Sequence, residues 1–522
     1  MTQSKESKNY DLLIVGAGMA GSILAARIAE KGVHPGTGDR LKVGLLEWGP
    51  YLKGNPRPGY GHPLRRRMFT NLTHDFRLRN HFSTPWGTGR LVGGSSMHFN
   101  AHAWRLLDVD YLHWQRETSL DWNAENFKDA VDEVQQMFNA HPVPEELLDP
   151  GQKLFVEAAT KMGYSPQRMS HARRNCIHCG LGCLPGQMCR YDSKMSSLVT
   201  YIPIAEKEGV DIIPNTRVEK VILEKRGSEF LATGVWALQE DRRVRFNADK
   251  VLLSAGVHGT PRILYQSGYG PKDLLGEDLI VENAHVGQHV DGKLAAPGFP
   301  AFFPFRVKEG DRGKPPSSYF FDDAAPEGYD RLIFKDGSSD PELPDRMALS
   351  DLAPEFGIEH KKFMRTRGDS IAKQVVLQYN RPRTLGGSIQ RDGSAVFLTN
   401  DPRDAQRLKE GMLIAREIYR EMGATRISNI DPMLRRLDQV GPGNPEPSPI
   451  RVTHAGGSCR AGADRKNSVV NERFECHDIK NLSICDLSVP PRTACGSPGV
   501  AMVAPLACLA WRRLVKDHFS RS

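Results

Sequence analysis

The chain of 522 residues is long enough for two to four domains, and its 39% hydrophobic and 25% charged residues are ordinary for a globular protein. The net charge is +8, but the densest basic spots, residues 65–67 and 173–174, lack the interleaved aromatic residues that nucleic-acid binders use. No apolar run reaches the roughly eighteen residues needed to span a bilayer. The composition therefore argues against a nucleic-acid partner and against a transmembrane segment.

The start of the chain, MTQSKESKNY, has no hydrophobic core of the kind that a secretion signal needs. We therefore expect a cytoplasmic protein, or a periplasmic one only if a signal-bearing partner exports it. Nine cysteines in such a chain argue against a disulfide framework. Four of them fall within residues 176–189 and form a separate candidate site.

The first predicted elements are a buried strand and a glycine-rich turn. Residues 12–15 read LLIV, and Gly16, Gly18 and Gly21 follow in the spacing GxGxxG. In this pattern the first glycine permits a tight turn, the second lets a pyrophosphate approach the backbone, and the third lets a helix pack on the strand.

A helix and a second strand complete the unit. Residues 22–30 are the expected helix, whose N-terminal N–H groups and dipole favour an anion. The second strand, residues 42–47, ends in Glu47, which is placed to accept hydrogen bonds from a ribose. A polar insert at residues 34–40 explains why this acid comes later than usual. The whole unit predicts a bound dinucleotide.

Further elements follow from periodicity along the rest of the chain. The predicted helices are residues 122–140, 154–162, 404–422 and 499–515, and one more that begins near Thr260 and Pro261. The predicted strands are residues 210–223, 250–256 and 481–486. Between about 291 and 440 the chain is richer in aromatic, proline and charged residues, which indicates a second domain.

Five sequence blocks occur in the order that one protein family shows. The first is the glycine-rich unit. The others are GRLVGGSSMHFN at residues 89–100, SAGVHGTPRILYQSG at 254–268, HAGGSCRAG at 454–462 and DLSVPP at 486–491. Over essentially its full length the chain resembles the glucose–methanol–choline (GMC) flavoprotein oxidoreductases, and within them the sugar or gluconate dehydrogenase-like and pyranose-oxidase-like branches.

The resemblance implies an α/β fold with a Rossmann-like FAD-binding domain and a discontinuous second domain, of α+β type, built on an antiparallel sheet. We expect residues 1–110, 195–290 and 445–522 to form the FAD-binding domain, and residues 111–194 and 291–444 to form the substrate-binding or cap region. The residues that the resemblance assigns to FAD are Gly16, Gly18, Met19, Ala20, Gly21, Glu47, Trp48, Arg90, Gly93, Gly94, Ser95, His98, Asn100, Val218, Ala255, Asp486 and Pro498.

His454 occupies the position of the family's catalytic base. An alcohol that gives hydride to flavin N5 must also lose its hydroxyl proton, and a neutral imidazole suits that task. The family usually has a second His or Asn where this chain has Ser497 followed by Pro498. Ser497 is therefore the second catalytic candidate. Serine is shorter than His or Asn, so His102 is the alternative if Ser497 does not contact the substrate oxygen.

His98 lies four residues after Gly94, where some family members attach the flavin covalently. A covalent bond would hold the cofactor and raise its potential. A noncovalent contact at His98 is the alternative.

The cysteines of the candidate site are Cys176, Cys179, Cys183 and Cys189. Close thiolates separated by Gly and Pro suit an iron–sulfur cluster or zinc, with His178 as a further zinc ligand. The alternative is a tight loop of reduced thiols. A cluster would pass electrons to a partner, such as a small subunit or a cytochrome; without one, the acceptor is oxygen or a diffusible quinone.

The sequence therefore predicts an FAD-dependent dehydrogenase or oxidase that acts on a CH–OH group of a sugar, a glycoside or another alcohol or polyol. Two alternatives remain. One is a flavin-containing lyase or isomerase of the same fold, without net oxidation. The other is a flavin subunit that relays electrons through a cysteine-bound iron–sulfur cluster to a partner protein.

Overall fold

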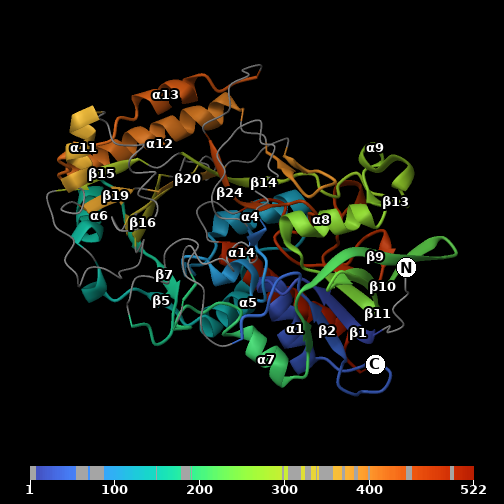
Figure 1. The fold of residues 1–522 in the computed structure, drawn as a ribbon. Coiled ribbons are helices and arrows are strands. Elements are labelled where there is room, and N and C mark those ends of the chain that lie inside the picture. Colours follow the sequence, from blue (N-terminus) through green and yellow to red (C-terminus); the bar gives the residue numbers. More distant parts are fainter. Residues whose placement is uncertain are drawn as a thin grey trace.

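The chain is built around two large β-sheets, which lie toward opposite ends of the molecule in the computed structural model (Figure 1). The structure describes residues 8–53, 69–70, 88–148, 150–177, 188–189, 191–296, 299–303, 319–323, 331–336, 338–339, 357–366, 371–374, 376–380, 386–397, 400–442, 450–493 and 499–521. Both termini of this part lie on the side of the first sheet (Figure 1).

The first sheet has the order β25-β10-β11-β1-β2-β8, with β26 also paired to β11 and β9 to β10. Strands β8, β2, β1, β11 and β26 are parallel neighbours, whereas β9, β10 and β11 are antiparallel. The bounds are β1 (Lys8–Val15), β2 (Val43–Leu46), β8 (Asp211–Ile213), β9 (Thr216–Arg226), β10 (Glu229–Gln239), β11 (Arg242–Leu253), β25 (Ile479–Lys480) and β26 (Leu482–Ile484). Strands from the start, middle and end of the chain thus share one sheet.

Helices cover this sheet and bury its apolar strands. Helix α1 packs against α14 and α7, and α14 also packs against α5. The apolar end of β1 is buried in the resulting core, as expected for a parallel strand that is covered on both faces. The bounds are α1 (Met19–Lys31), α4 (Asp108–Thr118), α5 (Ala124–Met137), α7 (Tyr201–Lys207), α8 (Gly256–Gln266) and α14 (Gly499–His518).

The second sheet is antiparallel and has the order β24-β14-β20-β17-β16-β6. Its bounds are β6 (Gln167–Arg168), β14 (Asp291–Ala295), β16 (Tyr319–Asp323), β17 (Arg331–Lys335), β20 (Val376–Asn380) and β24 (Arg451–Gly456). Helices α6 (Pro150–Lys161), α12 (Pro402–Glu421) and α13 (Asp431–Asp438) pack beside it and close a second apolar core (Figure 1). The antiparallel sheet predicted for the second domain is therefore present; the domain boundaries stay a prediction.

Smaller elements complete the described chain. A four-stranded sheet has the order β18-β19-β15-β23, and the other short strands form pairs. The bounds are β3 (Phe69–Thr70), β4 (Thr88–Gly89), β5 (Ala140–Pro142), β7 (Ser170–Ala172), β12 (Tyr269–Gly270), β13 (Val281–Glu282), β15 (Pro300–Phe303), β18 (Ser338–Ser339), β19 (Ile371–Gln374), β21 (Ser388–Ile389), β22 (Ala395–Val396), β23 (Arg426–Ile427), α9 (Lys272–Leu275), α11 (Gly357–Thr366) and the short 3₁₀ helix η1 (Gly94–Met97).

The predicted helices and strands are present, but several boundaries differ. The strand predicted at residues 250–256 is the end of β11, which begins at Arg242 and ends at Leu253, and α6 begins at Pro150. Helix α8 begins at Gly256, not near Thr260, so Pro261 lies inside the helix. The earlier start has a tertiary cause: the Asp486 carboxylate accepts hydrogen bonds from the Gly256 N–H at 2.8 Å and from the Thr260 hydroxyl at 2.6 Å, which holds the first turn in place. Among the described residues, no helix combines the length and the apolar character that crossing a membrane requires.

Candidate functional site

The glycine-rich turn after β1 has one glycine that faces open space. A Cβ atom on Gly16, whose φ is +101°, would lie 2.4 Å from the Ser254 carbonyl oxygen, and one on Gly21 would lie 1.9 Å from the Gly16 carbonyl oxygen. Both positions therefore require glycine. A Cβ atom on Gly18 would meet nothing within 4 Å, so the backbone there is open to an approaching group.

The N-terminus of α1 can hold an anion beside Gly18. Gly18 is the N-cap of this helix, no side chain caps it, and its first turn carries no acidic residue. The unpaired N–H groups at such a helix start, together with its dipole, favour a phosphate. Met19 and Ala20, the first helical residues, are buried. These features fit the pyrophosphate of a dinucleotide.

The second sequence block is held against this turn. The Gly93 N–H donates to the Ala17 carbonyl at 2.8 Å, and a Cβ atom on Gly94 would lie 2.7 Å from the Gly18 Cα. The block continues through η1 to His98 and Asn100, which are half-buried, and the Ser95 hydroxyl accepts from the Gly89 N–H. The structure thus brings Gly93 and Gly94 to the glycine turn, while the cofactor contacts of the other predicted residues of this block, and covalent attachment at His98, stay predictions.

Glu47 follows β2 and is nearly buried. Its two carboxylate oxygens accept hydrogen bonds from the Ala17 N–H at 3.0 Å and from the Gly49 N–H at 2.8 Å. Burial raises the pKa of Glu47, and these two donors and the charge of Arg90 oppose that rise. A carboxylate oxygen has a second lone pair, so Glu47 can still accept from a ribose hydroxyl.

Trp48 is the centre of a cluster of arginines. The guanidinium carbons of Arg90, Arg217 and Arg262 lie 4.9, 5.6 and 5.6 Å from the centre of its indole ring, within cation–π range. Val218, also predicted to contact the cofactor, is buried next to Arg217 on β9. Arg217 and Arg262 could not be identified from local sequence, because only the pairing of distant segments brings them to Trp48.

Asp486 joins the end of the chain to the start of α8. Besides the two bonds to α8, its carboxylate accepts from the Ser488 N–H at 2.7 Å. Burial raises the pKa of Asp486, which these donors oppose. Ala255, the N-cap of α8, donates its N–H to the Thr260 hydroxyl. Asp486 and Ala255 therefore hold the turn that follows Ser254 in place, and the Ser254 carbonyl lies against Gly16.

His454 lies at a bulge in β24. Along β14 the register moves from Asp291, opposite Gly456, to Lys293, opposite Thr453, so β24 contains one extra residue. His454 takes up this extra residue with a φ of +51°, the left-handed region that favours glycine. Bulges of this kind turn a side chain in a new direction and are common beside active sites.

The surroundings keep the His454 imidazole neutral. Burial, followed by the ammonium groups of Lys293 and Lys335, holds its pKa well below the ordinary histidine value. The residue is nevertheless exposed to solvent. Its exposure leaves the imidazole accessible to a small molecule, as a reacting group requires.

A second histidine, His102, stands near His454. His102 is buried, and burial is the main reason that its pKa lies well below the ordinary histidine value. The charges of His171, Lys335 and His454 lower this pKa further. Its Nε2 has no hydrogen-bond partner in the part of the chain that the structure describes. The ring lies 5.2 Å from that of Trp104.

Ser497 and Pro498, the other predicted residues of this region, lie outside the described residues. Gly499, which opens α14, is described, and a Cβ atom there would lie 3.6 Å from the His454 ring. The start of α14 is therefore next to His454.

The predicted cysteine site is only partly described. Cys176 and Cys189 are half-buried, whereas Cys179, Cys183 and His178 lie outside the described residues. An iron–sulfur cluster or zinc at this segment stays a prediction.

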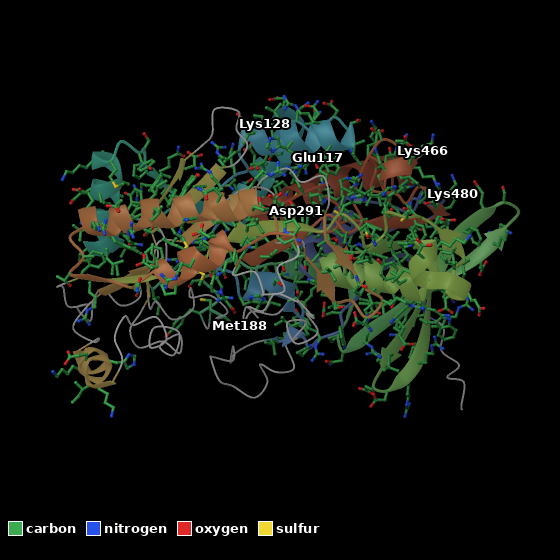
Figure 2. All side chains as sticks on the ribbon, turned by 90° about the horizontal axis from the view of Figure 1, so that it is seen from above. Glu117, Lys128, Met188, Asp291, Lys466 and Lys480 are labelled. Atoms are coloured by element: carbon green, nitrogen blue, oxygen red, sulfur yellow. The ribbon has the colours of Figure 1, made fainter. Side chains whose placement is uncertain are left out.

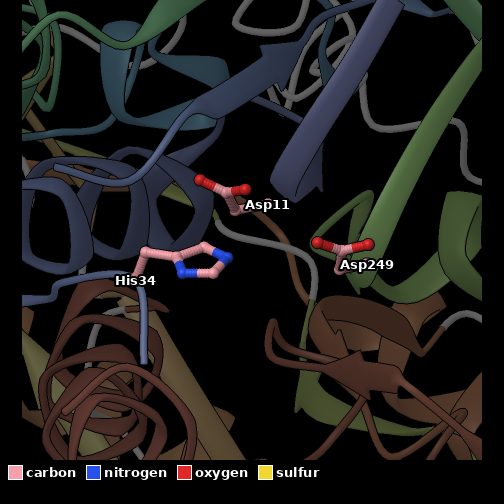
Figure 3. A group of neighbouring side chains, drawn as sticks. All are labelled: Asp11, His34 and Asp249. Atoms are coloured by element: carbon pink, nitrogen blue, oxygen red, sulfur yellow. The ribbon is translucent and has the colours of Figure 1, made fainter. Parts of the chain in front are cut away.

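A group of possible metal ligands lies elsewhere, where the side chains of Asp11, His34 and Asp249 point toward one another (Figure 3). The His34 Nδ1 accepts a hydrogen bond from the Thr37 N–H, which places the proton of the neutral ring on Nε2. A protonated Nε2 has no free lone pair and cannot bind a metal in this tautomer. We therefore assign no metal to this group.

Comparison with known proteins agrees with this geometry. A family profile described as GMC oxidoreductase matches residues 10–286, and a second profile of the same description matches residues 395–505. The chain is 24% identical to the FAD- and quinone-dependent glucose dehydrogenase of Drosophila pseudoobscura pseudoobscura, over 95% of this chain and 85% of that one. It is 26% identical to cholesterol oxidase of Mycobacterium tuberculosis, over 49% of this chain and 48% of that one.

Solved structures share the fold. Formate oxidase superposes with a TM-score of 0.71 at 15% identity and covers 99% of both chains. Pyridoxine 4-oxidase from Mesorbium loti gives 0.68 at 19% identity, over 98% of this chain and all of that one. Together with the family profiles and the dinucleotide cradle at Gly18, these likenesses show that the chain belongs to the GMC oxidoreductase family and is an FAD-dependent oxidoreductase.

Proposed function

We propose that the protein oxidises a CH–OH group of a small alcohol, sugar or polyol, with His454 as the base. Bound FAD supplies the acceptor for the hydride that leaves the carbinol carbon. His454 takes the hydroxyl proton, so the alcohol becomes a carbonyl compound and two electrons leave the substrate. The full-length likeness to a glucose dehydrogenase supports a sugar or polyol.

The position of His454 carries this proposal. A general base must be unprotonated at working pH, and burial together with Lys293 and Lys335 keeps this imidazole neutral. It must also reach the substrate, and His454, which stands at the left-handed bulge of β24, has a side chain that is exposed to solvent. A histidine with only a structural role would not need both features.

His102 is the best-placed described residue for a second contact to the substrate oxygen. Its buried Nε2 lacks a protein partner among the described residues, and an unsatisfied buried polar atom is costly unless a ligand uses it. Ser497 remains the other candidate for this contact.

The test is flavin reduction by alcohols and sugars without oxygen. The His454→Ala variant is expected to retain FAD and to lose reductive rate by on the order of a hundredfold or more, the scale for removing a positioned base. In the same assay His102→Phe, which keeps a ring beside Trp104, is expected to lose less. Lys480→Met, at an exposed lysine far along the first sheet, serves as the control.

Three results would contradict the proposal. An unchanged rate of flavin reduction in His454→Ala would show that His454 is not the base. Turnover of a substrate without flavin bleaching would favour a lyase or isomerase. Electron exchange with a protein partner alone, without reduction by any small molecule, would favour a relay subunit.

A further inference from the structure

Two segments of the chain run side by side next to His454. Three N–H groups within residues 457–461 donate to the carbonyls of residues 487–489 at 2.8–3.1 Å. Residues 486–493 are named here the C-terminal segment. At its end Thr493 contacts Gly456, because a Cβ atom on Gly456 would lie 3.2 Å from the Thr493 Cγ2. The C-terminal segment is therefore held in register with the chain that carries His454.

Helix α4 holds Arg492, in the C-terminal segment, at two points. The Arg492 carbonyl accepts a hydrogen bond from the Trp114 indole N–H at 3.1 Å, although the two residues are 378 positions apart. The Arg492 guanidinium forms an ion pair with Glu117, which lies one helical turn after Trp114. The helix thus fixes both the backbone and the side chain of Arg492.

The same helix is also bonded to the segment of the base. Its last residue, Thr118, accepts a hydrogen bond at its carbonyl from the Ala463 N–H at 2.9 Å, and Ala463 directly follows the block 454–462. The helix itself is well anchored, because Trp114 is fully buried and packs edge-on against three aromatic rings at 6.0–6.1 Å. Helix α4 is therefore a common support for the His454 segment and the C-terminal segment.

The Glu117–Arg492 ion pair is better explained by orientation than by stability. The Arg492 side chain is 9% exposed and that of Glu117 is 28% exposed, so both charges have lost much of their water. Such a pair stabilises a fold only when further hydrogen bonds satisfy its remaining donors. The Arg492 Nε has no hydrogen-bond partner in the part of the chain that the structure describes. A planar guanidinium that binds a carboxylate does, however, fix a direction.

We propose that Glu117 and Arg492 are positioning residues of the oxidation, which hold the chain that leads to Ser497 and to the start of α14 in place beside His454. This inference rests on the proposed function. The chain returns to the base soon after Arg492, since a Cβ atom on Gly499 would lie 3.6 Å from the His454 ring. A misplacement of about 1 Å caused by a residue far from the chemistry can lower a rate on the order of a hundredfold.

The test separates the rate of flavin reduction from the affinity for the substrate. The substrate is whichever of glucose, glucitol and glycerol reduces the wild-type flavin fastest without oxygen. We expect Glu117→Gln to retain FAD and to lower the limiting rate of reduction about tenfold, with a half-saturating substrate concentration that stays within about twofold of the wild type. Arg492→Met should give a similar loss, and Arg492→Lys, which keeps the charge, should restore part of the rate.

A double variant and a matched control complete this test. Glu117→Gln combined with Arg492→Met should lose no more rate than either change alone, because the same ion pair is broken in each protein. Asp132→Asn is the control, since it removes exposed ion pairs with Arg105 and Lys128 and is likewise a carboxylate-to-amide change. Lys128 lies nearer to the edge of the molecule than Glu117 in the view of Figure 2. The control should keep the wild-type rate.

A second measurement does not depend on turnover. The flavin ring is planar, so the visible circular dichroism of bound FAD arises from the groups around it. We expect Glu117→Gln to change this signal in the absence of substrate, and Asp132→Asn to leave it unchanged.

Two results would overturn the inference. One is a Glu117→Gln protein that is less stable in urea but keeps the wild-type rate and flavin signal, because the ion pair would then only stabilise the fold. The other is a double variant whose losses multiply, because the two residues would then act separately. A wild type that no alcohol reduces would contradict the proposed function alone, and the flavin signal would still decide whether Glu117 and Arg492 position the segment.

Discussion

His454 holds a backbone conformation that costs free energy. With a φ of +51° it lies in the left-handed region, where an L-residue is less stable by roughly 1–2 kcal/mol because its Cβ crowds the following carbonyl. Strain of this kind persists where the surrounding structure enforces it, and it is common at functional sites. In this chain the extra residue of the β24 bulge enforces it.

Two substitutions at His454 separate the side chain from the backbone. Both His454→Ala and His454→Gly delete the imidazole, but only glycine adopts a φ of +51° without crowding. We expect the glycine variant to be the more stable of the two by about 1 kcal/mol in urea unfolding, after the greater unfolded-state entropy of glycine is included. Both variants should lack rapid flavin reduction. If the alanine variant were as stable as the glycine variant or more so, the backbone at residue 454 would not be strained.

At the scale of a single element, α8 shows how a proline is accommodated inside a helix. Pro261 has no N–H, so the Val257 carbonyl loses its partner one turn further on. The Ser458 hydroxyl donates to that carbonyl at 2.7 Å from a segment 201 residues away. Ser458 is fully buried, so water does not readily replace this bond.

A double-mutant cycle tests this replacement. We expect Ser458→Ala to lower the free energy of unfolding by about 1 kcal/mol, the net value of one hydrogen bond. In a Pro261→Ala background the restored N–H can donate to the Val257 carbonyl. Ser458→Ala should therefore lower the free energy of unfolding by less in that background. The coupling energy from urea unfolding of the four proteins measures the difference. Equal costs in both backgrounds would show that Ser458 acts in another way.

The same helix shows what local sequence can predict about an element. The apolar run before Gly256 and the periodicity after it predict a strand and a helix, and both are present. The start of the helix was wrong by four residues, because proline is most common at the first turn. The contacts that start the helix earlier come from Asp486 and Ser458, and local pattern contains no information about such distant partners.

At the scale of the whole molecule, the site divides into a predictable and an unpredictable part. Gly18 and Glu47 could be identified from sequence because one continuous strand–turn–helix–strand unit places them. Lys293 and Lys335 could not, because their position depends on the register of a sheet whose strands span residues 167–456. Their strands lie in the stretch whose strand signals are weakest, so neither the pairing nor the face could be inferred.

Buried histidines couple the stability of the whole fold to pH. Burial lowers the pKa of His258, His289 and His113 to about 4. Their ordinary value is 6.5, so between pH 6.5 and 4 the unfolded chain binds more protons than the folded one, and the stability is lost as the pH falls through this window. The Glu475 carboxyl, whose pKa its hydrogen bond with His518 lowers to about 2, contributes its own loss only below about pH 4.5.

His258 offers a clean measurement of this effect. It is 8% exposed, and its Nδ1–H donates to the Gly393 carbonyl at 3.2 Å. Asparagine can place an N–H group near Nδ1 but does not titrate, so His258→Asn is the matched variant. Between pH 7 and pH 4.5 we expect the holoenzyme to lose on the order of 2 kcal/mol more unfolding free energy than the variant, since one pKa unit corresponds to about 1.4 kcal/mol. Parallel stability curves for the two proteins would mean that His258 is protonated as readily in the folded chain as in the unfolded one.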